Sequence, residues 1–276
     1  LGLQALCARY PVFAAHLQLV EAGAMTAEQI DLEALAPFFG EPLFHALLRH
    51  LILPHAGMER FLTVLRRRLL SMLSEEGQEL RAHHGVLTSL AVQGHINGYV
   101  YYRTPEEESL LESLQRRPHA PDVTLLLACY MPPVQESGAD SEFDRFVADI
   151  QRQRQRELAA ASGIEVLGGI EDAVSQAVRE QYEEHPYPRW INLPDIPQET
   201  PHGLLKRLFP RFDASVLSIE EKPQILIAGC GTGKQALEAA RRFPSGQVSA
   251  VDLCRASLAY AVCKTEEYRV TNIRYV

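Results

Sequence analysis

The chain has no apolar run long enough to cross a membrane, and it contains little cysteine. No stretch approaches the roughly 18 apolar residues that a membrane-spanning helix needs, and no basic segment followed by an apolar one opens the chain. The five cysteines, at positions 7, 129, 230, 254 and 263, are odd in number and have no paired metal-ligand spacing. We therefore expect a cytoplasmic protein with reduced, mostly buried thiols.

Positive charge is also scarce. The 27 lysines and arginines are outnumbered by 35 acids, and the formal net charge is −8, which argues against a nucleic-acid partner held by phosphate neutralisation. We interpret the one tight basic run of the early helices, Arg66-Arg67-Arg68, as a solvated helix face. His83, His84 and His95 lack the i,i+4 spacing with a supporting acid that a metal site on a helix needs, so we expect no metal.

Helical periodicity dominates the first half of the 276-residue chain. Residues 58–73 carry the longest amphipathic pattern of this half, and Thr104-Pro105 followed by two glutamates is typical of a helix start. The apolar run 123–131 fits a helix or a buried strand, and we favour the helix. Residues 140–161 predict a polar helix whose second half is exposed or contacts a partner. We predict an all-α domain over residues 1–168.

Residues 224–252 carry the most informative pattern of the chain, a predicted strand, glycine turn, helix and second strand that ends in an acid. The apolar run 225–228 predicts a strand buried on both faces, and a glycine turn, a helix over 234–243 and a strand over 247–251 follow. A further helix (255–267) and strand (273–276) continue this alternation, which predicts a parallel sheet. Such sheets bind ligands at the carboxyl ends of their strands, where Asp252 is placed to accept hydrogen bonds from ribose hydroxyls.

The glycine spacing discriminates between nucleotides. A dinucleotide fingerprint needs a third glycine where this chain has Lys234, and a phosphate-binding P-loop needs Ser or Thr where it has Gln235. Neither of these phosphate-binding motifs fits.

The same residues resemble a known family. The run ILIAGCGTG, residues 225–233, resembles motif I of class I S-adenosylmethionine-dependent methyltransferases, and Val251-Asp252-Leu253 resembles their acidic motif. Many relatives have an acid where this chain has Ile227, so one polar contact to the amino-acid end of the cofactor is missing or supplied elsewhere. The resemblance implies that the glycines lie against the methionine part of the cofactor and that Asp252 holds its ribose, in a site formed by Gly229, Cys230, Gly231, Thr232, Gly233, Asp252 and Leu253.

A second patch resembles a subgroup. Residues 178–190, with the run YEEHPYPRW, and residues 256–261 resemble bacterial methyltransferases that are often fused to tetratricopeptide repeats. In such enzymes the helix that precedes the methyltransferase domain, here called the lead-in, covers the cofactor pocket. The resemblance implies that Tyr182 or Tyr187 closes over the cofactor, or else pins the linker to the sheet domain together with Trp190, and it makes Arg189 a candidate for the cofactor carboxylate.

These inferences predict an α/β chain with three parts. Residues 1–168 form a helical cap or substrate domain, residues 169–202 a lead-in helix and proline-rich linker, and residues 203–276 the first half of a Rossmann-like domain that binds S-adenosylmethionine. Because the chain begins with Leu1 and ends inside the third expected strand, we expect the N-terminal portion of a longer enzyme, inactive by itself.

The expected reaction is transfer of the sulfonium methyl group of S-adenosylmethionine to an acceptor, a small molecule or a protein, with no membrane involved. No catalytic base is assigned from the sequence. Two alternatives remain. One is a non-catalytic interaction module with a remnant nucleotide-binding βαβ unit, and the other is an NAD-dependent oxidoreductase, which Lys234 disfavours.

Overall fold

The computed structural model describes residues 2–74, 77–116, 120–169, 172, 174–176, 179, 183, 186, 188–211, 213 and 222–276. The chain divides into two compact units, Leu1–Gln151, here the helical unit, and Arg152–Val276, here the sheet unit. The helical unit contains α1 (Gly2–Arg9), α2 (Pro11–Glu21), η1 (Ala27–Gln29), α3 (Ala36–Phe39), α4 (Pro42–His50), α5 (Ala56–Ser74), η2 (Arg81–His83), α6 (His84–Ile96), α7 (Pro105–Gln115), α8 (Pro121–Ala128) and the first half of α9 (Ser141–Ser162).

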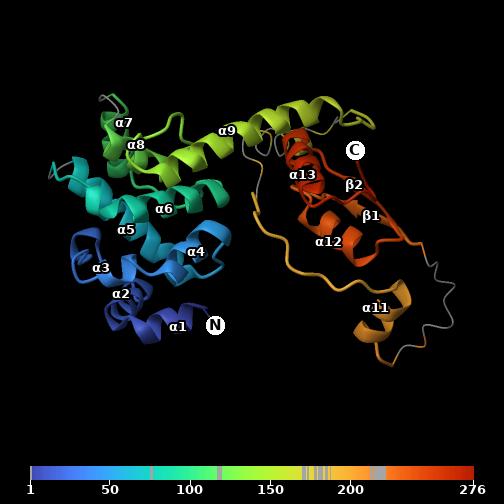
Figure 1. Ribbon diagram of the computed structural model, residues 1–276, viewed down its shortest axis with the longest axis horizontal. Coiled ribbons are helices and arrows are strands. Elements are labelled where there is room, and N and C mark those ends of the chain that lie inside the picture. The colour runs from blue at the N-terminus through green and yellow to red at the C-terminus, as the bar shows by residue number, and fades with distance from the viewer. Residues whose placement is uncertain are drawn as a thin grey trace. The chain divides into compact units, whose positions relative to one another are not determined.

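The helical unit is built around α5, the 19-residue helix that the periodicity of residues 58–73 predicts. It contacts α2, η1, α7 and α8, and its apolar face, including Phe61 and Leu65, is fully buried. Phe13 of α2 stacks on Phe38 with ring centroids 4.0 Å apart. Figure 1 shows these helices layered from α1 at one end to α7 and α8 at the other. The helical prediction for this half is confirmed, including the helix at α8.

The interpretation of the basic run in α5 as a solvated face is wrong for its first residue. Arg66 is only 2% exposed. Its guanidinium lies 3.9 Å from the ring centroid of Tyr130 and donates to the carbonyl oxygens of Cys129 and Tyr102 at 3.3 and 3.1 Å. A buried guanidinium requires such acceptors because an unpaired buried charge is costly. These acceptors lie far along the chain, so the local charge pattern did not indicate them.

Helix α7 starts with a capping box, and the glutamate of this box is also buried in the core of the helical unit. Thr104 accepts a hydrogen bond from the amide of Glu107, as the sequence predicts. The Glu107 carboxylate, 1% exposed, accepts from Arg67 and from the Tyr130 hydroxyl, both at 3.0 Å. Burial raises the pKa of Tyr130 well above its usual range, so this hydroxyl stays protonated and continues to donate. One side chain thus caps a helix and pairs a buried charge.

The helical unit is expected to lose stability as the pH falls below about 6.5, the unfolded-state pKa of histidine. Burial lowers the pKa of His45, with a smaller effect of Arg49 in the same direction, although the Phe39 carbonyl opposes them. The unfolded chain therefore binds a proton before the folded one does, and the free energy of unfolding decreases with falling pH. His83, whose pKa is also lowered by burial, acts in the same direction.

Denaturant titrations at pH 7.5 and 5.5 measure this effect. In the His45→Gln variant the difference between the two pH values should shrink, whereas His50→Gln, at an exposed position of the same helix, should leave it unchanged. An equal difference in the wild type and the His45→Gln variant would contradict the assignment.

Helix α9 is shared between the two units, and the division falls at Gln151 within it. Phe143 and Val147, near its start, are buried in the core of the helical unit. Its second half packs against the sheet unit through Ala160 and Ala161, and Ile164 follows on the same core. The second half of the predicted polar helix therefore contacts the chain's own sheet unit.

The sheet unit contains α11 (Pro201–Leu208), β1 (Gln224–Ala228), α12 (Lys234–Arg242), β2 (Gln247–Val251), α13 (Arg255–Glu267) and β3 (Ile273–Tyr275). The strands are parallel in the order β1-β2-β3, with Leu226 opposite Ser249 and Ser249 opposite Arg274. The parallel strands and the bounds of β1, α12, β2, α13 and β3 agree with the sequence prediction to within one residue. The helix expected over 169–184 falls largely outside the described residues, and the proline-rich residues 188–200 form no helix or strand.

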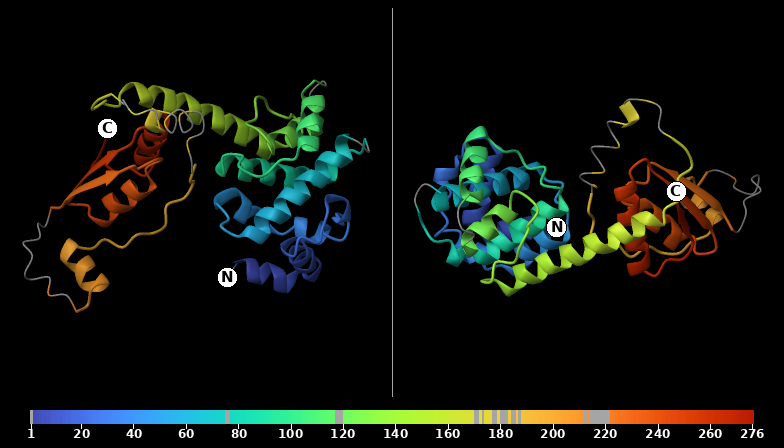
Figure 2. Two further views of the ribbon diagram at one scale, coloured as in Figure 1. Left: turned by 180° about the vertical axis from the view of Figure 1, so that it is seen from behind. Right: turned by 90° about the horizontal axis from the view of Figure 1, so that it is seen from above.

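The prediction that β1 is buried on both faces is wrong. Ile227 is buried in the core with Ala236 and Leu258, whereas Leu226, on the opposite face, is 69% exposed. Figures 1 and 2 show α12 and α13 on the same face of the sheet. Because α12 and α13 both cover this one face, only alternate residues of β1 become buried. No helix of the described residues has the length and apolar character of a membrane span.

Candidate functional site

The turn between β1 and α12 depends on its three glycines. Gly229, Gly231 and Gly233 have φ values of 66°, 52° and 78°, in the left-handed region that residues with a β-carbon rarely adopt. A β-carbon added at Gly229 or Gly231 would meet no protein atom within 4 Å. These two glycines therefore leave main-chain atoms open to a ligand.

The third glycine serves packing. A β-carbon at Gly233 would lie 2.4 Å from the β-carbon of Ala261 and 3.0 Å from the Tyr275 hydroxyl. The turn and α13 thus approach each other at a distance that only glycine permits.

The Asp252 carboxylate joins the end of β2 to the glycine turn. Its Oδ2 accepts from the Gly231 amide at 2.7 Å, and its Oδ1 accepts from the Cys254 amide at 2.9 Å. Each carboxylate oxygen has a second lone pair, so the group can still accept from a ligand. Because both oxygens are already held by the backbone, Asp252 is an acceptor of fixed orientation.

A cavity of about 670 Å³ opens above the turn, a size typical of small-molecule sites. Of the residues predicted to bind a cofactor, Gly229, Cys230, Gly231, Thr232, Asp252 and Leu253 line it, whereas Gly233 and Arg189 do not. Sequence reasoning missed the other lining residues, of which Lys234 and Gln235 directly follow the turn. The missed residues are Arg179, Pro188, Lys234, Gln235, Val251, Cys254 and Ser257.

Two thiols line the cavity as neutral groups. Burial and the neighbouring Asp252 raise the pKa of Cys230 to about 12, and burial raises the pKa of Cys254. A thiol with a raised pKa is a poor nucleophile at neutral pH. Cys230 therefore acts here as a small residue beside the cavity.

The lead-in segment is attached directly to the glycine turn. The Trp190 indole, 3% exposed, donates to the Thr232 carbonyl at 3.0 Å, and the Thr232 hydroxyl donates to the Pro188 carbonyl at 2.7 Å. The Tyr260 hydroxyl donates to the Trp190 carbonyl at 2.6 Å. Trp190 therefore pins the linker to the sheet unit.

A second attachment lies at the start of α13. The Glu183 carboxylate accepts from the amides of Arg255 and Ala256 at 2.7 and 3.0 Å, which offsets the unpaired amides of that helix end. The predicted cofactor contacts of Tyr182 and Tyr187 fall on positions outside the described residues.

The side chain of Arg189 does not line the cavity, although the sequence suggested it as a ligand of the cofactor carboxylate. Its guanidinium forms two hydrogen bonds, 2.8 and 3.1 Å long, with the two oxygens of Glu157 and lies 5.2 Å from the ring centroid of Tyr260. This paired arrangement joins the lead-in to α9. The arginine that does line the cavity, Arg179, comes ten positions earlier in the chain.

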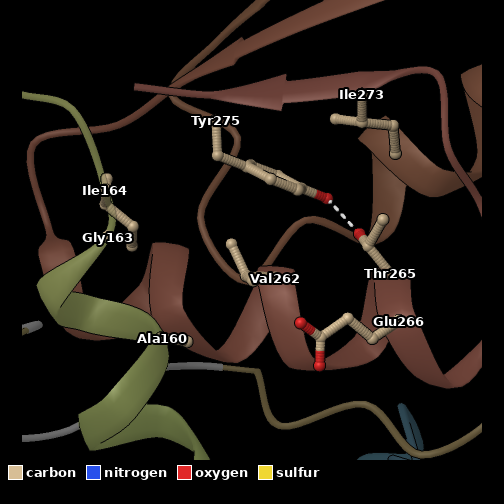
Figure 3. A pocket seen from close by; sticks show the side chains of 8 residues that line it. All are labelled: Ala160, Gly163, Ile164, Val262, Thr265, Glu266, Ile273 and Tyr275. Carbon is tan, nitrogen blue, oxygen red and sulfur yellow. Dashed lines mark hydrogen bonds between the residues drawn. The ribbon is translucent and has the colours of Figure 1, made fainter.

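A smaller cavity of about 280 Å³ lies between the end of α9, α13 and β3 (Figure 3). Its walls are mainly apolar, with Ile164 facing Val262 and Tyr275, and the Tyr275 and Thr265 hydroxyls are hydrogen-bonded to each other at 2.8 Å. The one charged lining residue, Glu266, is within 3.5 Å of Arg156. This cavity shares no lining residue with the one above the turn.

The cavity above the turn fits an S-adenosyl compound. Asp252 offers acceptors for ribose hydroxyls, Val251 and Leu253 offer apolar surface for a base, and the glycine turn admits close approach. In the part of the chain that the structure describes, no cluster of three or more His, Cys, Asp or Glu side chains is arranged for a metal ion.

Comparison with known proteins gives one match. Residues 225–276 match the family model of the methyltransferase domain. Neither the curated proteins nor the solved structures yield a significant match. The matched residues run from β1 to the end of the chain and include the glycine turn and Asp252. The match supports an S-adenosylmethionine-dependent methyltransferase domain in this part of the chain.

Proposed function

We propose that the chain binds S-adenosylmethionine above the glycine turn, in a Rossmann-like domain, and serves the transfer of its methyl group to an acceptor. The observation that carries the proposal is the Asp252 carboxylate, held over the turn by the amides of Gly231 and Cys254 at the wall of a cavity of about 670 Å³. The family match over 225–276 supports the same reaction class.

In this proposal, the residues of the chain bind the cofactor and orient it for the reaction. When bound, the cofactor would supply a sulfonium methyl group, whose carbon an acceptor nucleophile can attack in line while S-adenosylhomocysteine leaves with the electrons of the methyl–sulfur bond. Asp252 accepts from the ribose hydroxyls, and the open backbone at Gly229 and Gly231 receives the methionine part. Positioning of this kind supplies much of the rate in a displacement between two bound reactants.

No proton-removing residue is assigned to the described wall of the cavity. Asp252 is the one carboxylate among the described lining residues, and its two oxygens already accept backbone hydrogen bonds. We therefore assign it to ribose binding. The acceptor is a small molecule or a protein. The described wall of the cavity identifies neither the nucleophilic group of the acceptor nor the base that would remove its proton.

Calorimetric titration with S-adenosylmethionine, S-adenosylhomocysteine and NAD tests the proposal. We expect the first two to bind and NAD not to bind. Asp252→Ala should weaken both about 10- to 100-fold, because a hydrogen bond to a charged group contributes roughly 1.5–3 kcal/mol. Asp195→Ala, at a fully exposed position of the same unit, is the matched control.

Asp252 also holds the turn, so the variant's fold must be checked. Trp190 is the only tryptophan of the chain, and its indole donates to the turn at Thr232, so its fluorescence reports whether the turn is intact. Binding of NAD in preference to the S-adenosyl compounds would favour an oxidoreductase. Absence of binding by all three would leave the interaction module as the better proposal.

A further inference from the structure

The cavity above the turn contains an arginine that the fold does not use. Arg179 and Lys234 are the cations among its described lining residues. Arg179 is half-buried, and none of the hydrogen bonds or ion pairs of the described chain involves its side chain. By contrast, Arg49, Arg66, Arg67, Arg156 and Arg189 each pair with a carboxylate or a carbonyl oxygen. A half-buried guanidinium without an acceptor indicates a place for an anionic group.

The backbone of the turn is poorly equipped to bind that anion. The Cys230 amide donates to the Val251 carbonyl and the Gly233 amide to the Cys230 carbonyl, both at 3.0 Å, and the Gly231 amide donates to Asp252 at 2.7 Å. Three amides of the turn are therefore already committed within the fold. These three amides cannot serve a carboxylate that enters the cavity, so side-chain donors become the stronger candidates for binding it.

Building on the proposed function, we propose that Arg179 binds the carboxylate at the methionine end of the cofactor and so makes the site select ligands that carry the amino acid. The guanidinium offers two parallel donors that match a carboxylate, which a lysine ammonium does not. This assignment replaces Arg189, whose guanidinium is paired with Glu157. Lys234, the first residue of α12 and exposed, is the competing cation.

Two ligands that differ only at this end test the proposal. S-adenosylhomocysteine carries the amino acid, whereas 5′-methylthioadenosine keeps the nucleoside and thioether without it. Titration of the full chain with Arg179→Gln should show a 10- to 100-fold loss of affinity for S-adenosylhomocysteine and less than a twofold change for methylthioadenosine. Lys234→Gln should change both affinities by less than about threefold, and Arg179→Lys should recover part of the loss.

The outcomes separate the two proposals. If wild-type protein binds neither ligand, the proposed function fails, and the role of Arg179 fails with it. If wild-type protein binds both and Arg179→Gln weakens them equally, or weakens neither, the cofactor site stands and the role of Arg179 is overturned. A selective loss in Lys234→Gln alone would overturn it in favour of Lys234. Trp190 fluorescence confirms in each variant that the turn is intact.

Discussion

Replacing Gly233 by alanine is expected to destabilise the sheet unit by about 2–5 kcal/mol. The left-handed backbone at φ 78° costs a residue with a β-carbon roughly 1–2 kcal/mol, and overpacking adds about 1–3 kcal/mol. The overpacking arises because the new β-carbon would lie 2.4 Å from that of Ala261. Ala261 lies on α13, so relief of the clash requires α13 and the turn to separate.

Urea denaturation followed by Trp190 fluorescence measures this loss, since Trp190 is buried in the sheet unit beside Leu237 and Tyr260. Gly229→Ala is the matched control. Its φ of 66° carries the same backbone cost, but its β-carbon would meet no protein atom, so it should lose only the backbone part. That methyl group would instead enter the cavity and weaken S-adenosylhomocysteine binding. Equal destabilisation by the two variants would contradict the packing role of Gly233.

Replacing Glu107 by alanine is expected to destabilise the helical unit by about 3–5 kcal/mol, the usual effect of removing one partner of a buried charged pair. The change removes the acceptor of Arg67 and of the Tyr130 hydroxyl. It also removes half of the capping box with Thr104. The Tyr130 side chain is fully buried, so water does not replace the lost partner.

Denaturant-induced loss of helical circular dichroism measures this change. Glu108→Ala removes an exposed acid from the same first turn of α7 and should alter the free energy of unfolding by less than about 0.5 kcal/mol. A Glu107→Ala variant as stable as the Glu108→Ala variant would show that the buried pair contributes nothing net.

The sequence predicted the elements of the sheet unit well because their signals are local. Glycines that need a positive φ, the apolar spacing of α12 and the Pro244-Ser245-Gly246 stop lie within a few residues of the structure that they determine. Thr104 and Glu107 are three residues apart, so their capping box is also a local signal. For the same reason, most of the residues that line the cavity at the turn and at the end of β2 could be named in advance.

Features that depend on distant partners were not predictable in this way. Arg66 is buried because the carbonyl oxygens of Cys129 and Tyr102 face it, and Leu226 is exposed because the described helices cover the other face of the sheet. Residue type alone ranks an arginine as exposed and a leucine as buried. Only contacts between residues far apart in the chain reverse that ranking here.

The two arginines of the lead-in show most clearly what the local sequence determines and what the tertiary structure determines. From the sequence, Arg189 and Arg179 are both cations ahead of a glycine turn, and the family resemblance named Arg189 alone. Local sequence determined that a turn open to a ligand forms between β1 and α12 and that an acid stands at the end of β2. The tertiary structure decided which of the two arginines lines the cavity. Glu157 on α9 pairs with Arg189, whereas Arg179 lines the cavity and has no partner in the described chain.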